Sequence, residues 1–184
     1  NKNCGAINVR ELSKKILEVK ADIGFAFDGD GDRIIAVDEK GNQIDGDKII
    51  ALFAKNYVKQ KKLKKNTVVT TEMSNLGLEK YLNNELGVKL IRTKVGDINV
   101  ISEMNKNSYI LGGEQSGHII LGNFTNTGDG ILTALKILEI MSSDKIKASK
   151  LFDIYEQYPQ IKINLPINKQ LNGNSIKNLN KIVK

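Results

Sequence analysis

The sequence predicts an α/β fold in which mixed sheets are connected by crossover helices. Three observations lead to this expectation. Short apolar runs of strand length alternate along the chain with longer segments of helical spacing, and glycines or polar turns separate most of them. The 184 residues are 40% hydrophobic and 27% charged, which is the composition of a globular chain with one good core.

The first elements are expected to be a helix and two strands. Apolar residues recur every three or four positions over residues 9–17, which is helical spacing. The compact apolar run 23–27 predicts a buried strand that leads into a loop. A second strand over 34–37 leaves that loop and ends at the polar turn 38–42.

The middle of the chain repeats a strand and helix alternation, which favours a sheet with crossover helices. The same patterns predict helices over 47–59, 76–86, 98–105, 128–141 and 148–155, and strands over 67–71, 88–93, 109–111 and 118–121.

The period changes after Pro159, where apolar and other residues alternate over 161–167 as in a half-exposed strand. We therefore expect one domain boundary near 41–46 and another near Tyr158. One whole domain would then lie between two partial ones, and an incomplete chain is expected because it begins at Asn1.

Composition limits the classes of function. The net charge of +7 fits either an anionic partner or a lysine-rich composition, but the lysine clusters at 59–65 and 145–150 lack interleaved aromatic residues. Nucleic acid is therefore not an expected partner. The longest apolar runs are far shorter than the ~20 residues of a membrane span, and Cys4 is the single cysteine, so we expect a cytoplasmic protein. The sequence does not indicate an oligomeric state.

The strongest chemical signal is a loop with a carboxylate at every second position, Asp28, Asp30 and Asp32, separated by glycines. Such a cluster repels itself unless a cation occupies it, and oxygen ligands suit Mg²⁺ or Ca²⁺. Arg33 follows directly and offers a planar fork that matches phosphate. A polar turn without a cation is the simpler alternative.

A calcium-binding EF-hand is the sharper alternative, because the aspartates fill its first, third and fifth positions and Glu39 its twelfth. Arg33 stands where that loop requires glycine, however, and the flanking segments are predicted strands. These features favour a Mg²⁺ ion shared with a phosphate.

A second loop, 112–118, has the sequence G-G-E-Q-S-G-H after a predicted strand. Glu114 and Ser116 alternate, so both can face one ligand, and together they offer the acceptor and donor that vicinal sugar hydroxyls require. His118 is the only histidine and is a candidate acid or base beside them, although a lone histidine is more often structural.

The two loops together resemble the α-D-phosphohexomutase superfamily, whose metal loop reads D-G-D-G-D-R and whose sugar loop reads G-E-x-S-G-H. Within it, the chain is most similar to the phosphoglucosamine mutases. The further segments that carry this similarity are N-C-G at 3–5, M-S-N-L-G-L at 73–78, K-V-G-D at 94–97 and T-G-D-G-I at 127–131.

The resemblance implies an isomerase that interconverts glucosamine 6-phosphate and glucosamine 1-phosphate through a phosphoserine and a bisphosphorylated sugar, on the route to bacterial cell-wall precursors. It implies that the three aspartates bind Mg²⁺ and that Arg33 contacts the phosphoryl group or its carrier serine. Glu114 and Ser116 would hold sugar hydroxyls, and His118 would assist proton transfer.

The resemblance also implies a multi-domain enzyme, of which this chain would hold the end of the second domain (1–41), the third domain (42–157) and the start of the fourth (158–184). No counterpart of the family's serine loop is found. Ser74 is not a substitute for the serine of that loop, because it precedes a predicted helix and is expected, with Asn75, to cap it. The chain alone is therefore expected to be inactive.

Two residues depart from the family pattern, since Ile98 and Asn99 stand where an arginine and an aromatic residue usually follow V-G-D. A phosphomannomutase or phosphoglucomutase of the same superfamily is the nearest alternative function. A non-catalytic calcium-binding protein is the alternative of another class.

Overall fold

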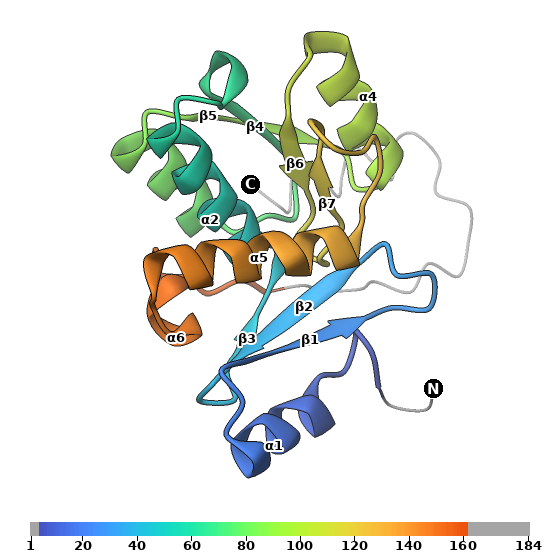
Figure 1. The fold of residues 1–184 in the computed structure, drawn as a ribbon. Helices are drawn as coiled ribbons and strands as arrows, with labels where there is room; N and C mark the ends of the chain where they lie inside the picture. Colours follow the sequence, from blue (N-terminus) through green and yellow to red (C-terminus); the bar gives the residue numbers. More distant parts are fainter. Residues whose placement is uncertain (1–3, 162–184) are drawn as a thin grey trace, which may run out of the picture.

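The computed structural model describes residues 4–161 and contains two sheets with helices packed between and around them (Figure 1). The first sheet is antiparallel, in the order β1 (Ile23–Phe27), β2 (Ile34–Asp38) and β3 (Gln43–Ile44). Phe27 pairs with Ile34, so the segment between them closes the β1–β2 hairpin. The aspartate-rich loop is therefore held at both ends by paired strands.

The second sheet has the order β5 (Lys89–Thr93), β4 (Thr67–Thr71), β6 (Leu111–Gly113) and β7 (Ile119–Leu121). The first three strands are parallel, and β7 runs antiparallel to β6. Because parallel strands end at the same edge, the loops after β4, β5 and β6 all leave the sheet on one side, where open α/β sheets bind ligands.

Two long helices cover opposite faces of the second sheet. Apolar residues of α2 (Gly46–Lys59) share a core with Val68 of β4 and Leu111 of β6. On the other face, α4 (Asp97–Asn107) contributes residues to a separate cluster with β4 and β7. The second sheet is thus the middle layer of an α/β/α arrangement.

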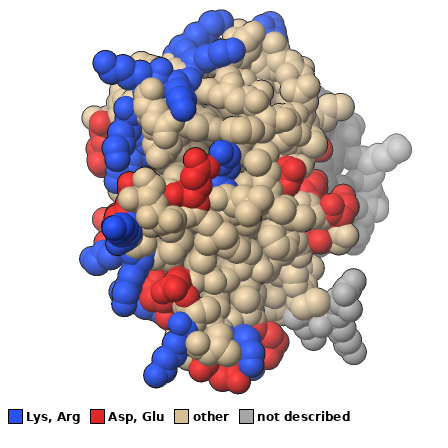
Figure 2. Space-filling model, in the orientation of Figure 1, with Lys and Arg blue, Asp and Glu red and all other residues tan. Residues whose placement is uncertain are grey.

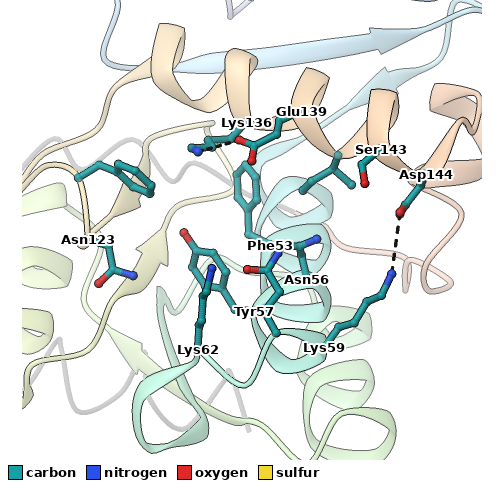
Figure 3. Close-up of a pocket in the computed structure, with 13 residues that line it drawn as sticks. Phe53, Asn56, Tyr57, Lys59, Lys62, Asn123, Lys136, Glu139, Ser143 and Asp144 are labelled. Atoms are coloured by element: carbon teal, nitrogen blue, oxygen red, sulfur yellow. Dashed lines mark hydrogen bonds and ion pairs between the residues drawn. The ribbon is translucent and has the colours of Figure 1, made fainter.

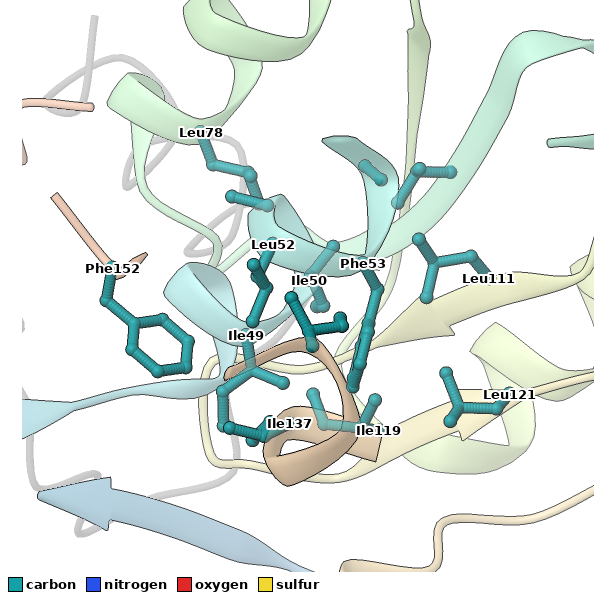
Figure 4. Packing of buried hydrophobic residues seen from close by; sticks show 14 of the residues in the cluster. Ile49, Ile50, Leu52, Phe53, Leu78, Leu111, Ile119, Leu121, Ile137 and Phe152 are labelled. Carbon is teal, nitrogen blue, oxygen red and sulfur yellow. The ribbon is translucent and has the colours of Figure 1, made fainter. Parts of the chain in front are cut away.

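The first sheet is also covered on both faces, which explains why β2 is apolar from Ile34 to Val37. Ile34 and Ala36 belong to the main core beneath α5 (Gly130–Asp144), whereas Ile35 and Val37 pack with α1 (Arg10–Val19). Helix α5 contacts β2 and β7 and so links the two sheets. Figure 4 shows the main core, in which α2 residues meet side chains from the sheet and from α5.

Three short helical segments complete the fold. These are α3 (Leu76–Lys80), which continues as a π-helical turn over Tyr81–Glu85, a 3-10 turn (Lys64–Asn66) and α6 (Ala148–Leu151). Within residues 4–161 there is no helix long and apolar enough to cross a bilayer.

The mixed α/β class is confirmed, but several predicted boundaries are wrong. The helix expected over 148–155 ends at Leu151, because Tyr155 instead stacks on Tyr81 and lies under the Lys48 ammonium group. Strand β6 starts two residues later than expected, and β1 is half-buried because it is an edge strand. The strand expected over 161–167 falls almost entirely outside the described residues.

Candidate functional site

The carboxylates of Asp28, Asp30 and Asp32 gather in the β1–β2 loop. One oxygen from each lies within 4.8 Å of the others. Octahedral Mg²⁺ has ligand oxygens at about 2.1 Å, hence about 3 to 4 Å apart, so modest side-chain rotations are enough to close the loop on such an ion. The all-oxygen donor set fits Mg²⁺ and leaves positions for waters or phosphate oxygens.

The electrostatics of the loop also fit a cation. Burial, together with the neighbouring carboxylate of Asp28, raises the pKa of Asp32. For Asp28, burial acts in the opposite sense to the backbone N–H of Arg33, which donates to its carboxylate at 3.1 Å and helps to lower its pKa. A bound cation relieves the repulsion between these carboxylates.

The Arg33 side chain remains accessible at the edge of this loop. Its Nε lies 3.7 Å from Asp28 Oδ2, and 44% of the side chain is exposed. The guanidinium is thus anchored on one side beside the aspartates and open to solvent on the other. An incoming phosphate can be contacted from this position.

His118 connects the second loop to the aspartates. Its Nδ1 lies 3.0 Å from Asp32 Oδ2, and its Nε2 accepts a hydrogen bond from the backbone N–H of Gly128 at 3.1 Å. The ring is 1% exposed. The histidine is therefore enclosed, with a partner at each nitrogen.

Glu114 is buried at the carboxyl end of β6 and links two loops. Its Oε1 accepts from the backbone N–H of Gly96 at 3.1 Å, and its Oε2 lies 3.4 Å from the Ser116 hydroxyl, which donates weakly to it. Gly96 adopts a φ of 120°, a conformation that favours glycine, as the N-cap of α4. The serine itself is exposed, so its hydroxyl is available to a ligand.

The T-G-D-G turn at 127–130 presses against the aspartate loop. A Cβ on Gly128 would lie 2.6 Å from both the Asp32 carbonyl oxygen and the His118 ring. The N–H of Gly130 donates to the Gly31 carbonyl at 2.9 Å. Only glycine permits this approach, and Asp129 between them caps α5 by accepting from Leu132 N–H.

The structure thus brings together the residues singled out from the sequence, at the junction of the two sheets. These are Asp28, Asp30, Asp32, Arg33, Glu114, Ser116 and His118. The proximity of the two loops is not evident from either loop alone.

Two further expectations can be compared with the structure. Asn75 caps α3 by accepting from Gly77 N–H, so the capping role predicted for this segment is confirmed for Asn75. The EF-hand alternative is contradicted, since the loop joins two paired strands and Glu39 instead accepts hydrogen bonds from Ser149.

Sequence reasoning did not identify Gly96 and Gly128 as parts of this site. Both act through backbone N–H groups, which carry no residue signature of their own. The available signal was the glycine in K-V-G-D and in T-G-D-G, each immediately before a helix, because such glycines often allow close approach.

Other surface features lie apart from these loops. A pocket of about 250 Å³ between α2 and α5 is lined by residues such as Tyr57, Phe124 and Lys136, and Asp28, Asp30 and Asp32 are not among its lining residues (Figure 3). Figure 2 shows Lys and Arg gathered along one edge of the visible face, with acidic side chains among them.

Comparison with known proteins gives consistent results. The family model described as phosphoglucomutase/phosphomannomutase, alpha/beta/alpha domain III, matches residues 45–158. Phosphoglucosamine mutase from Zymomonas mobilis is 52% identical over 162 residues, which cover 88% of this chain and 36% of that protein. The Thermodesulfovibrio yellowstonii enzyme of the same name is 49% identical over 179 residues, 97% of this chain and 40% of its own length. The chain therefore spans about two fifths of these curated relatives.

Solved structures share the fold. A phosphoglucomutase/phosphomannomutase family protein from Burkholderia thailandensis superposes with a TM-score of 0.72 at 27% identity, covering 81% of this chain and 32% of that one. N-acetylphosphoglucosamine mutase from Aspergillus fumigatus, in complex with GlcNAc-6P and magnesium, gives a TM-score of 0.68 at 21% identity, covering 86% and 41%. At the latter identity the likeness concerns the fold alone.

Proposed function

Since the chain belongs to the phosphoglucomutase/phosphomannomutase family, we propose that it supplies the metal-binding and sugar-binding loops of a mutase for glucosamine 6-phosphate and glucosamine 1-phosphate. In the proposed reaction a phosphoserine and a bisphosphorylated sugar carry the phosphoryl group between the two positions. That serine is assigned to no residue of this chain.

One observation supports this proposal most strongly. The aspartate loop and the G-E-Q-S-G-H loop meet through Asp32 and His118 at 3.0 Å, although 86 residues separate them. A phosphosugar between the loops would have its phosphate near Arg33 and its hydroxyls near Ser116. When bound, Mg²⁺ would neutralise charge on the phosphoryl group, and Asp28, Asp30 and Asp32 would hold it there.

The chain's own groups then have separate tasks. Arg33 would bind the phosphoryl oxygens through its open guanidinium face. Glu114 retains acceptor capacity beyond its bonds to Gly96 and Ser116, because each carboxylate oxygen has two lone pairs. It would accept from a sugar hydroxyl while Ser116 donates to the next one.

The preference for an amino sugar is supported by the names of the relatives. Proteins about half identical to this chain over most of its length are phosphoglucosamine mutases. We place the reaction in the bacterial cytoplasm, in the formation of amino-sugar precursors of the cell wall, with Mg²⁺ as cofactor. A phosphomannomutase or phosphoglucomutase with the same loops is the remaining alternative.

A chimera tests the proposal. This chain replaces the matching segment of the Zymomonas mobilis enzyme, and mutase rates are measured with glucosamine, mannose and glucose 6-phosphates under Mg²⁺. We expect turnover with the highest kcat/KM for the glucosamine phosphate. A higher kcat/KM for a neutral hexose phosphate would move the chain to the alternative function. A folded chimera that turns over none of the three would contradict the proposal.

A further inference from the structure

The proposed substrate carries a charge that none of the residues discussed so far binds. A glucosamine phosphate differs from a glucose phosphate at C2, where an amine replaces a hydroxyl, and this amine is protonated around neutral pH. An ammonium group has only hydrogen-bond donors, so it requires an acceptor, and an ionised carboxylate is the strongest acceptor that a side chain offers. A site that prefers the amino sugar therefore needs a carboxylate beside the sugar ring.

The carboxylates in and around the two loops already have other tasks. The three aspartates of the β1–β2 loop would hold Mg²⁺, whose charge repels an ammonium group. Glu114 is 7% exposed, and its two oxygens face the Gly96 N–H and the Ser116 hydroxyl. Asp129 caps α5. The ammonium group thus requires another carboxylate.

Two further acidic side chains, Glu72 and Asp97, stand in the loops that follow the parallel strands β4 and β5. Glu72 lines an open pocket together with Arg92, and the lining of that pocket includes neither Gly96 nor Glu114. Asp97 directly follows Gly96, whose N–H is bonded to Glu114 at 3.1 Å. Asp97 is therefore the carboxylate that the fold places next to the sugar loop.

The Asp97 side chain is held in place and is still accessible. It begins α4, and its Oδ1 accepts a hydrogen bond from the backbone N–H of Ile98 at 2.8 Å. Within residues 4–161, its Oδ2 accepts no hydrogen bond and its carboxylate pairs with no lysine or arginine. Asp97 is exposed, whereas Glu114 is buried. One oxygen of Asp97 thus orients the group, and the other is open to a ligand.

We propose that Asp97 binds the substrate ammonium group and thereby determines the preference for an amino sugar. This inference rests on the proposed function, because it names the residue that selects the proposed substrate. The bond between Gly96 and Glu114 joins the two acceptors, so that Glu114 accepts from a hydroxyl and Asp97 from the ammonium group of the same ring. A neutral hexose phosphate offers Asp97 only an uncharged hydroxyl, which lacks the attraction between opposite charges.

The first test measures binding by this chain. Calorimetric titration under Mg²⁺ compares glucosamine 6-phosphate with glucose 6-phosphate and with N-acetylglucosamine 6-phosphate, in which acylation removes the charge of the amine. We expect the wild type to bind the glucosamine phosphate at least about tenfold more tightly than either neutral sugar. In Asp97→Asn, which retains an oxygen for the Ile98 N–H, this difference should shrink to within about threefold. Equal affinities of the wild type for all three sugars would overturn the inference.

The second test measures specificity in the chimera, with Glu72→Gln as the matched control. Both variants remove one carboxylate from a loop at the same edge of the sheet, so both change the net charge equally. We expect the ratio of kcat/KM for glucosamine 6-phosphate to that for glucose 6-phosphate to fall at least about tenfold in Asp97→Asn. In Glu72→Gln the ratio should stay within about threefold. Thermal unfolding checks that both variants are folded.

The outcomes separate this inference from the proposed function. If Asp97→Asn lowers kcat/KM for both sugars by the same factor, or leaves both unchanged, Asp97 does not recognise the amine and the inference fails. If Glu72→Gln lowers the ratio as much as Asp97→Asn does, the effect is one of net charge and the inference also fails. A wild-type chimera that prefers a neutral hexose phosphate, or a chain that binds no phosphosugar, contradicts the proposed function itself and this inference with it.

Discussion

The carboxylate of Glu114 accepts a hydrogen bond from the backbone N–H of Gly96 at 3.1 Å, and this bond connects the loop after β6 to the loop after β5. Both loops leave the same edge of the second sheet, where strand β4 separates their strands. A side chain proposed to hold a sugar hydroxyl therefore also fixes the start of α4.

Replacing Glu114 should loosen the Gly96 loop in a way that depends on the acceptor. Glu114→Gln retains a carbonyl oxygen for the Gly96 N–H, whereas Glu114→Ala leaves it without this partner. Since a hydrogen bond to a charged group contributes about 1.5 to 3 kcal/mol, amide exchange at Gly96 should accelerate roughly tenfold or more in Glu114→Ala. The glutamine variant should stay within severalfold of wild type. Equal protection in both variants would show that the bond does not hold the loop.

Asp47 should make the chain less stable as pH rises. Its side chain is fully buried, one oxygen accepts from Asn75 N–H at 2.7 Å, and the other has no partner among the described residues. Burial is the main cause that raises the pKa of Asp47 to about 6. A raised pKa means that this group stabilises the fold below its unfolded pKa near 4, and that the contribution is lost as pH rises through about 6.

Comparison of the wild type with Asp47→Asn isolates this effect, because all other titrating groups are shared. Relative to the variant, the wild type should lose on the order of 2 kcal/mol of unfolding free energy between pH 4 and pH 7.5. Urea denaturation across this range measures the difference. If the difference in unfolding free energy between the wild type and Asp47→Asn does not change with pH, the raised pKa of Asp47 is contradicted.

Gly128→Ala should displace the aspartate loop, because the added Cβ would lie 2.6 Å from the Asp32 carbonyl oxygen and from the His118 ring. Overpacking of this kind costs about 1 to 3 kcal/mol, and weaker Mn²⁺ binding should accompany the loss. Gly29→Ala, in the aspartate loop itself, is the control, since nothing lies within 4 Å of its added Cβ. If the two variants have the same melting temperature and the same Mn²⁺ affinity, the close packing of the turn at 127–130 has no role in the site.

Ile98→Arg introduces the arginine that the family resemblance leads us to expect after V-G-D. Ile98 is 73% exposed at the start of α4, so the substitution should change stability by less than about 0.5 kcal/mol. In the chimera the added cation should lower KM for the phosphosugar severalfold. An unchanged KM would indicate that this position does not face the substrate.

Much of the fold and of the candidate site can be predicted from local sequence patterns. Three alternating aspartates between two apolar runs were sufficient to predict a strand-to-strand loop with oxygen ligands, because both features depend on neighbouring residues. Apart from the short strand β3 and the 3-10 turn at Lys64–Asn66, the order of strands and helices was likewise evident from periodicity. These features need no information about distant parts of the chain.

Contacts between distant segments could not be predicted in this way. The bonds from His118 to Asp32 and from Gly96 to Glu114 join loops that only the tertiary fold brings together. Tyr155 was expected in a helix, but packing against Tyr81 and Lys48 takes the chain out of helical conformation. Whether residues 1–41, 42–157 and 158–184 are separate domains stays a prediction.

The most direct test of the central claim, that the aspartate loop and the sugar loop form one site, is calorimetric titration of this chain with Mg²⁺ in the presence and absence of glucosamine 6-phosphate. We expect weak Mg²⁺ binding, and we expect the phosphosugar to strengthen it about tenfold, which is a usual size for the coupling between two ligands. Asp30→Asn should abolish the Mg²⁺ binding. Mg²⁺ affinity that the phosphosugar leaves unchanged, or far tighter binding of Ca²⁺ with a change of fold, would contradict it.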